Sequence, residues 1–165
     1  MEDRMRSEAL SHLAGYSSVM LATVDADGPH VRPVTLIDHD GAYWIETGTG
    51  SAKVTQIRDN SKVELCLLFT EGENSGYVRL SAAAEIVTDA ATRKRVSSHT
   101  GFFKDYWTSP DDPSFTLLHI MPTVVEYMRP GEMEPHLFKL WASPRRTELN
   151  QVYLQKRRWQ NAQFP

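Results

Sequence analysis

Three polar side chains on two nearby segments of the sequence could together bind an anion. Arg32 lies in the segment PHVRPVT, and Ser51 and Lys53 lie in the segment GTGSAK. Arg32 and Lys53 supply full positive charges, and the Ser51 hydroxyl can donate a hydrogen bond. A helix is predicted to begin at Ala52, and its free amides and partial positive charge favour a phosphate. These residues therefore predict a phosphate-binding site.

The same residues also have a purely structural interpretation. Ser51 could cap the predicted helix with its side chain, and Lys53 could be a solvated residue of the first helical turn. Capping serines are so common that spacing alone favours this interpretation. The two interpretations differ in whether Ser51 and Lys53 face a ligand.

Signatures of other chemistries are missing from the sequence. It contains no HExxH, no paired CxxC and no EF-hand loop, so no metal site is expected. GxSxG and GxGxxG are also missing, and GTGSAK is too short for the phosphate loop of nucleotide-binding enzymes. No acid–base pair or nucleophile stands out, and we assign no catalytic residue.

The segments that carry the candidate side chains are predicted to be β-strands joined by short turns. Residues 17–24 and 30–37 are rich in β-branched and apolar side chains and flank a turn at 25–29, which indicates a hairpin. Residues 42–47 are predicted to be the third strand of the same antiparallel meander. Arg32 would then lie in the second strand, and the third strand would lead into GTGSAK.

Hydrophobic patterning predicts further elements around this meander. Residues 63–69 are largely apolar, so this strand is expected to be covered on both faces. Residues 77–87 alternate between apolar and polar side chains, as in a half-buried strand. The order of elements predicts a mainly β fold, a small antiparallel barrel with peripheral helices. The remaining predictions are helices at 3–14 and 52–59, a helix capped by Asp89 and ending near 98, a helical turn within 102–107, loops at 70–76 and 108–114, and a strand at 115–127 bent near Pro122.

Length and composition fit a single globular unit. The chain has 165 residues, of which 41% are hydrophobic and 24% charged, and this balance argues against a disordered chain. We expect residues 1–128 to form one domain and residues 129–165 to form a loop and helical extension packed on it. The net charge of −3 argues against nucleic acid or a membrane surface as partner. One cysteine, short apolar runs and no N-terminal leader pattern favour a cytoplasmic protein.

Several segments, taken in order, resemble one known protein family. They are PHVRPVT, YWIETGTGSAK with the helix and strand after it, YVRLSAAAEIV, and DYWTSPDDPSFTLLHIMPTVVEYM. Over about residues 5–128 the chain is similar to the FMN-binding split-barrel family, the pyridoxamine 5'-phosphate oxidase-like group, and in particular to its general-stress-protein-type branch. The resemblance implies a six-stranded antiparallel split β-barrel, a homodimer, and one FMN in each of two clefts at the subunit interface.

Carried over by position, the resemblance also implies which residues contact the cofactor. Arg32 and Lys53 would contact the FMN phosphate together with Ser51. The family places aromatic residues from the segment 102–107 near the flavin, which makes Trp107 a candidate here. The flavin ring would be bordered, mostly through backbone groups, by Val34, Thr35, Ile45, Glu46 and Thr47.

The activity that the resemblance implies is FMN-dependent oxidoreductase chemistry on a small-molecule substrate that the sequence does not identify. True pyridoxamine phosphate oxidases bind the substrate phosphate with a C-terminal arginine–histidine signature. No such pattern follows Arg129, which argues against vitamin B6 oxidation. The alternatives are a non-catalytic module that binds or senses flavin in a stress response, and a split barrel that binds haem or a deazaflavin.

Overall fold

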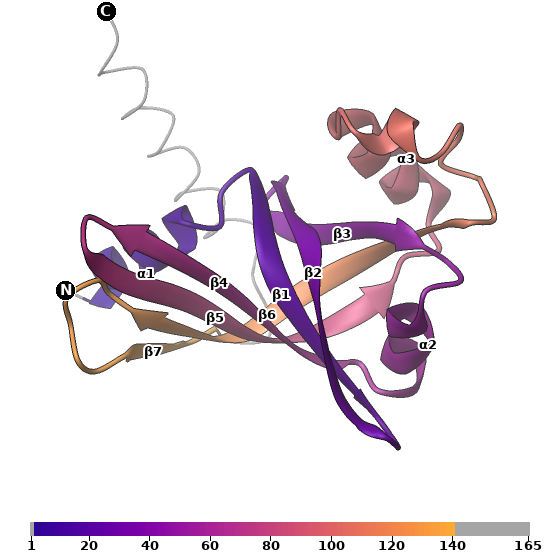
Figure 1. The fold of residues 1–165 in the computed structure, drawn as a ribbon. Helices are drawn as coiled ribbons and strands as arrows, with labels where there is room; N and C mark the ends of the chain where they lie inside the picture. Colours follow the sequence, from indigo (N-terminus) through magenta and orange to yellow (C-terminus); the bar gives the residue numbers. More distant parts are fainter. Residues whose placement is uncertain (1, 141–165) are drawn as a thin grey trace, which may run out of the picture.

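Residues 2–140 are described by a computed structural model, in which strands predominate (Figure 1). The helix predicted within the C-terminal extension lies outside the described residues. The elements, in chain order, are α1 (Glu2–Ser11), β1 (Tyr16–Asp25), β2 (Gly28–His39), β3 (Ala42–Gly48), α2 (Ala52–Asp59), β4 (Lys62–Glu71), β5 (Asn74–Ile86), α3 (Ala90–His99), the 3-10 helix η1 (Phe103–Asp105), β6 (Phe115–Met128) and β7 (His136–Lys139).

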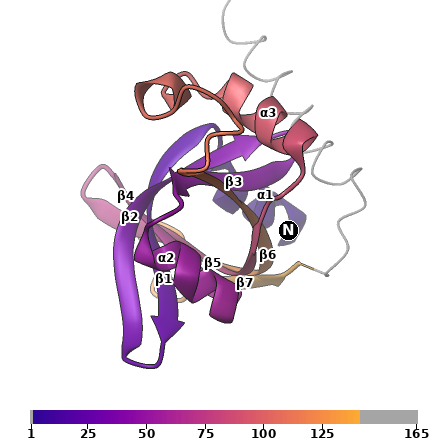
Figure 2. The same ribbon diagram turned by 90° about the vertical axis from the view of Figure 1, so that its right-hand side faces the viewer.

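Six of the strands close into a ring, which Figure 2 shows end-on. The hydrogen-bonded order is β3-β2-β1-β4-β5-β6-β7, and an additional β3–β6 pairing joins the two sides of the sheet. Every strand pair is antiparallel. The predicted mainly β fold, a six-stranded antiparallel split β-barrel with peripheral helices, is therefore confirmed.

Strand β6 is long enough to pair with both β3 and β7 along the same edge. Its first part, Phe115–Ile120, pairs with β3, and its last part, Val124–Tyr127, pairs with β7. The register of β5 against β6 shifts between Ser81 and Ala82, which leaves Thr123 as an extra residue beside Pro122. A proline donates no ladder hydrogen bond, and a bulge accommodates it. The predicted irregularity near Pro122 is thus confirmed.

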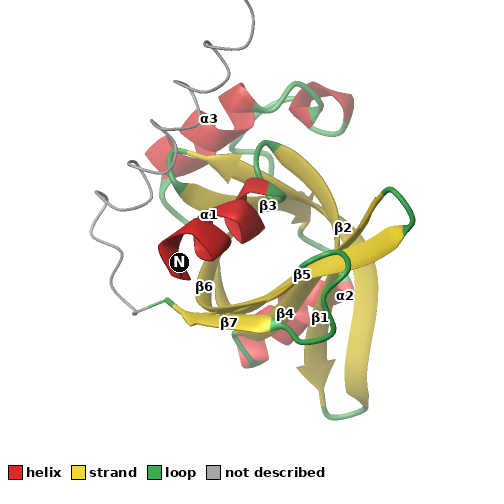
Figure 3. Ribbon diagram, turned by 90° about the vertical axis from the view of Figure 1, so that its left-hand side faces the viewer, coloured by secondary structure: helices red, strands yellow, loops and turns green. Residues whose placement is uncertain are grey.

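The barrel interior is filled from alternating strand positions and closed by helices at its two ends. Along β5 the inward side chains are Val78, Leu80, Ala82 and Ala84, all buried as the alternation predicted. Helix α1 lies across one end of the ring (Figure 3), and α2 lies at the other end (Figure 2). Leu13, just after α1, and Ile57 of α2 both belong to the main core cluster.

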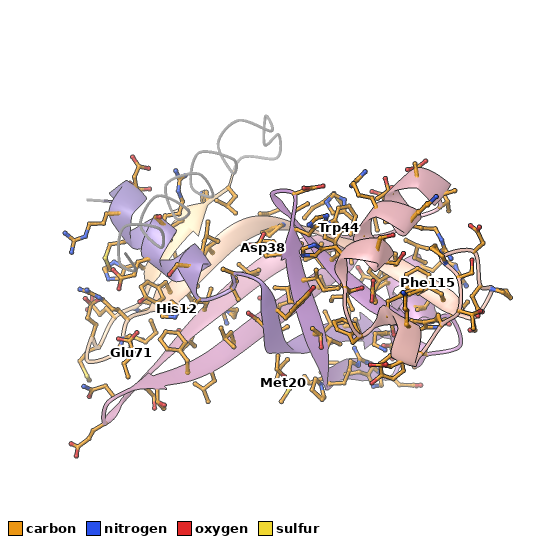
Figure 4. The ribbon with its side chains drawn as sticks, turned by 90° about the horizontal axis from the view of Figure 1, so that it is seen from above. His12, Met20, Asp38, Trp44, Glu71 and Phe115 are labelled. Atoms are coloured by element: carbon orange, nitrogen blue, oxygen red, sulfur yellow. The ribbon has the colours of Figure 1, made fainter. Side chains whose placement is uncertain are left out.

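A second, smaller cluster lies between the outside of β3 and the segment that contains α3 and η1. Its central side chains include Trp44 and Phe115, which are labelled in Figure 4. Val96 of α3 and Phe103 of η1 pack against them and are buried. This apolar cluster attaches α3 and η1 to the barrel wall.

The first helix ends at Ser11, three residues before its predicted end, and the loop predicted at 70–76 is wrong. The loop expected at 70–76 is instead a tight hairpin, in which β4 runs to Glu71 and β5 begins at Asn74. Gly72 turns the chain there with a φ of 60°, a conformation that favours glycine. The residues around this turn are polar because they are solvent-exposed, so they lack the apolar alternation from which strands were predicted.

Strand β4 is not covered on both faces within the described residues, contrary to the expectation for 63–69. Leu68 is 73% exposed, although Val63 and Leu65 on the opposite face are buried. The exposed face continues onto β1 and β2, where Met20 is 50% and Val31 is 65% exposed (Met20 is labelled in Figure 4). We call the outward side of β1, β2 and β4 around Met20, Val31 and Leu68 the open face.

Candidate functional site

The end of the barrel that α2 occupies brings the three predicted phosphate-site residues together with Thr47, which was predicted to border the flavin ring. Arg32 lies opposite Leu21 of β1, so its side chain starts from the inward face of β2. Lys53, in the first turn of α2, donates a hydrogen bond of 2.8 Å from Nζ to Thr47 Oγ1. Thr47 stands near the end of β3, and its Oγ1 lies 3.4 Å from Ser51 Oγ. Strands β2 and β3 and the N-terminus of α2 therefore bring two cations and two hydroxyls close together.

The two cations are half-buried and lie close enough to repel each other. Burial lowers the pKa of Lys53, and the nearby charge of Arg32 lowers it further. Burial also lowers the pKa of Arg32, against a smaller opposing effect of the Asp25 carboxylate. No carboxylate of residues 2–140 forms an ion pair with Arg32 or Lys53. An anion bound between them would relieve this repulsion, so the arrangement fits a phosphate.

Ser51 does not cap α2 with its side chain. It occupies the N-cap position with extended backbone angles, as predicted, but its hydroxyl forms no capping hydrogen bond. Asp89, at the same position of α3, does accept a hydrogen bond from the Thr92 amide. The capping interpretation is therefore wrong for the Ser51 side chain. Its hydroxyl lies 3.4 Å from the Thr47 hydroxyl instead.

A network that sequence reasoning missed supports the Arg32 guanidinium. Arg32 donates from Nη1 to Thr23 Oγ1 and from Nη2 to Gln56 Oε1, the latter at 2.9 Å. Thr23 donates to the same Gln56 oxygen at 2.6 Å, and Gln56 Nε2 donates to Asp25 Oδ2 at 2.7 Å. Two signals were available: Gln56 lies three residues after Lys53, and Thr23 is a polar residue in the inward alternation of β1.

The other predicted cofactor residues occupy different environments in the fold. Val34 lies on the same inward face of β2 as Arg32, whereas Thr35 points to the opposite, exposed side. Ile45 is part of the main core. Trp107 is half-buried against Phe115, with ring centroids 5.0 Å apart. Their contacts with a flavin ring stay predictions, as does the contact predicted for Glu46.

Glu46 points away from the cation pair, toward the end of α3. Thr100, which follows α3, donates a 2.8 Å hydrogen bond to Glu46 Oε1. The second carboxylate oxygen, Oε2, is buried and has no hydrogen-bond partner among the described residues. Burial raises the pKa of Glu46 to about 7, against a smaller lowering by the Thr100 hydrogen bond. Glu46 is thus protonated more readily than an ordinary glutamate.

Residues 2–140 contain neither a cluster of metal ligands nor a membrane-spanning helix. No group of three or more histidine, cysteine, aspartate or glutamate side chains in this part of the chain is arranged to hold a metal ion. None of its helices combines the length and the apolar character that crossing a membrane requires.

Sequence comparison extends the likeness to a named family and a named relative. Residues 5–129 match the family described as Pyridoxamine 5'-phosphate oxidase. General stress protein 26 of Bacillus subtilis is 28% identical over 133 residues, which cover 79% of this chain and 93% of that protein.

Solved structures with the same fold include proteins of different ligand classes. General Stress Protein 26 from Bacillus anthracis has a TM-score of 0.65 at 23% identity, over 82% of this chain and 98% of that chain. A FAD-binding protein from Mesorhizobium loti has a TM-score of 0.63 at 19% identity, over 76% and 93%. A heme binding protein from Mycobacterium smegmatis has a TM-score of 0.65 at 18% identity, over 81% of this chain and 57% of that one. The closed six-strand ring and the match over residues 5–129 show that this chain belongs to the pyridoxamine 5'-phosphate oxidase-like family, with relatives of the general stress protein 26 type.

Proposed function

We propose that this chain binds FMN by its phosphate and uses it in oxidoreductase chemistry on a small-molecule substrate. The observation that carries the proposal is the pair of half-buried cations, Arg32 and Lys53, neither of which forms an ion pair with a carboxylate of residues 2–140. A phosphate dianion between them would accept hydrogen bonds from the Arg32 N–H groups that Thr23 and Gln56 leave unused, and from the Lys53 ammonium. Ser51, whose hydroxyl is not used for capping, would donate a further hydrogen bond.

The choice of flavin rests on the family and on the type of anion that the residues fit. The FAD-binding structural neighbour from Mesorhizobium loti supports a flavin, and two adjacent cations match the charge of a terminal phosphate dianion. When bound, the flavin supplies hydride or electron transfer. The chain would contribute binding of the phosphate, orientation of the ring and exclusion of water.

We also propose that the chain works as a homodimer that covers the open face. Met20 of β1 lies opposite Pro33 of β2 on one side and Cys66 of β4 on the other, so the exposed apolar positions are continuous across three strands. Exposed apolar patches of this kind mark interaction surfaces. Light scattering at micromolar concentration should give twice the chain mass, and Leu68→Glu should lower it toward the monomer. A monomeric wild-type protein would overturn the homodimer.

The absorption spectrum of the purified protein tests the cofactor. We expect a yellow preparation, or a colourless one that binds added FMN and quenches its fluorescence, with FMN bound more tightly than riboflavin. A protein that binds neither flavin would overturn the proposal. Haem carries anionic propionates that could also use the two cations, so a haem Soret band without flavin binding would replace FMN by haem.

A second measurement separates turnover from binding alone. Addition of NADH or NADPH without oxygen should bleach the flavin absorption band. Later addition of an electron acceptor should restore the band. A flavin that stays oxidised with both nucleotides and with chemical electron donors of similar potential would instead support a module that stores or senses flavin.

A further inference from the structure

We propose that Gln56 and Asp25 are positioning residues that aim the Arg32 guanidinium at the phosphate while leaving its positive charge unpaired. The inference rests on the proposed function, because the phosphate is the group that Arg32 would bind. It assigns a role to two residues that do not touch the ligand. Gln56 would act through Arg32, and Asp25 would act through Gln56.

The Gln56 amide lies at the centre of the network, and each of its polar atoms is used. Its side-chain oxygen accepts from Arg32 Nη2 and from Thr23 Oγ1, and its side-chain nitrogen donates to Asp25 Oδ2. Gln56 is only 6% exposed, so water cannot readily replace these partners. Thr23, which is also buried, accepts from the other terminal nitrogen of Arg32. Both ends of the guanidinium fork are therefore held.

The charge of Asp25 determines which way round the Gln56 amide must lie. Turning the amide over would set its N–H groups against the guanidinium N–H groups and its oxygen against the Asp25 carboxylate. Hydrogen bonds from His30 and Gln56 lower the pKa of Asp25 to about 2, so the carboxylate is ionised at neutral pH. A negative Asp25 accepts hydrogen bonds only, and it therefore selects the orientation in which Gln56 accepts from Arg32.

An amide in this position does what a carboxylate could not do. A glutamate at position 56 would ion-pair with Arg32 and compete with the phosphate for the guanidinium. Glutamine offers an acceptor of similar geometry without a charge. The negative charge in the network is that of Asp25, which contacts Gln56 and not the Arg32 guanidinium. The site thus keeps a cation oriented and available at the same time.

A double-mutant cycle tests the inference with FMN and riboflavin titrations on the purified full-length chain. Gln56→Leu should weaken FMN binding about three- to tenfold and riboflavin binding less than about twofold. In an Arg32→Ala background, the same substitution should change FMN binding by less than about twofold, since the residue through which it acts is gone. Thr55→Leu, at an exposed position of the same helix, is the matched control and should leave both affinities unchanged.

Asp25→Asn provides a second variant for the same test, because it removes one charge and keeps the side-chain volume nearly constant. It should weaken FMN binding about two- to fivefold in the wild-type background and have almost no effect without Arg32. If Gln56→Leu fails to fold, this variant and Gln56→Met provide the same test. Three results would overturn the inference. The variants could lose as much FMN affinity with Arg32→Ala as with Arg32 present, they could lose as much riboflavin affinity as FMN affinity, or they could lose no FMN affinity at all.

The outcomes distinguish this inference from the function on which it rests. If the wild-type protein binds FMN no better than riboflavin, both are wrong. If it prefers FMN and Arg32→Ala removes that preference, but Gln56→Leu and Asp25→Asn leave it intact, only the positioning role is wrong.

Discussion

Replacing Lys53 by alanine should weaken FMN binding about tenfold to a hundredfold and leave riboflavin binding almost unchanged. Riboflavin has the same ring and lacks the phosphate, so a side chain that touches only the phosphate should affect FMN alone. In the structure the Lys53 ammonium is hydrogen-bonded to Thr47 and lies within the electrostatic reach of Arg32. It is therefore already directed toward the place where a phosphate would lie.

The magnitude follows from the burial and charge of the Lys53 ammonium. A charge-assisted hydrogen bond contributes about 1.5–3 kcal/mol, and each step of about 1.4 kcal/mol changes a dissociation constant tenfold. Lys53 is half-buried, so solvent screens its charge less than that of a surface lysine. Removing it also ends the repulsion with Arg32 in the free protein. The variant should accordingly be no less stable than the wild type when no flavin is present.

The assay is quenching of flavin fluorescence, titrated with FMN and riboflavin in the same buffer. Lys53→Met keeps most of the apolar chain and removes the charge, so it should lose as much FMN affinity as Lys53→Ala. Arg58→Ala is the matched control, because Arg58 is an exposed cation in the last turn of the same helix. It should change FMN affinity by less than about twofold.

Two results would refute this reasoning about Lys53. An unchanged FMN affinity in Lys53→Ala would mean that the ammonium does not contact the phosphate. Equal losses for FMN and riboflavin would mean that the substitution damages the fold or the ring site and not a phosphate contact. Rising salt concentration should reduce the difference in FMN affinity between the wild type and Lys53→Ala, because salt screens an electrostatic contribution.

Three further predictions concern stability and are measured by urea unfolding. Glu46 binds its proton more tightly when folded, with a pKa of about 7, so the free energy of unfolding should fall as pH rises from about 4.5 to 7. Glu46→Gln should flatten that dependence, and an identical pH profile in both proteins would contradict the burial argument. Gly76→Ala should cost about 1–3 kcal/mol, because its Cβ would lie 2.7 Å from a backbone oxygen, whereas Gly101→Ala meets nothing within 4 Å and should be neutral. Asp89→Ala should cost about 1 kcal/mol by removing the cap of α3, and Asp89→Asn should restore most of it; equal stability of all three proteins would exclude a capping role.

Much of the fold was predictable because the patterns that encode it are local. The alternation in 77–87 predicted the inward face of β5, and the helix predicted at 52–59 is α2 with the same bounds. The turn at 25–29 predicted the hairpin of β1 and β2. The hairpin at Gly72 was missed because exposed strand residues carry no apolar period.

The closure of the barrel could not be read from any single segment. Strand β3 pairs with β6 across about seventy residues of sequence, and β6 divides one edge between β3 and β7. The pairing of β3 with β6 depends on the register of every strand between them. The sequences of β3 and β6 do not by themselves indicate whether the two strands pair. The order of elements indicated a small barrel, and the family resemblance supplied its six strands and its split form.

For the site, the sequence by itself determined the residue types: two cations and a serine in segments that a turn and a short helix bring near one another. Only the tertiary structure decided that Ser51 does not cap its helix and that Arg32 rests on Thr23 and Gln56. The reason is physical, because a hydrogen bond between side chains depends on distance and direction in space. Residues from β1, β2 and α2 acquire that geometry only when the hairpin register and the packing of the helix are both set.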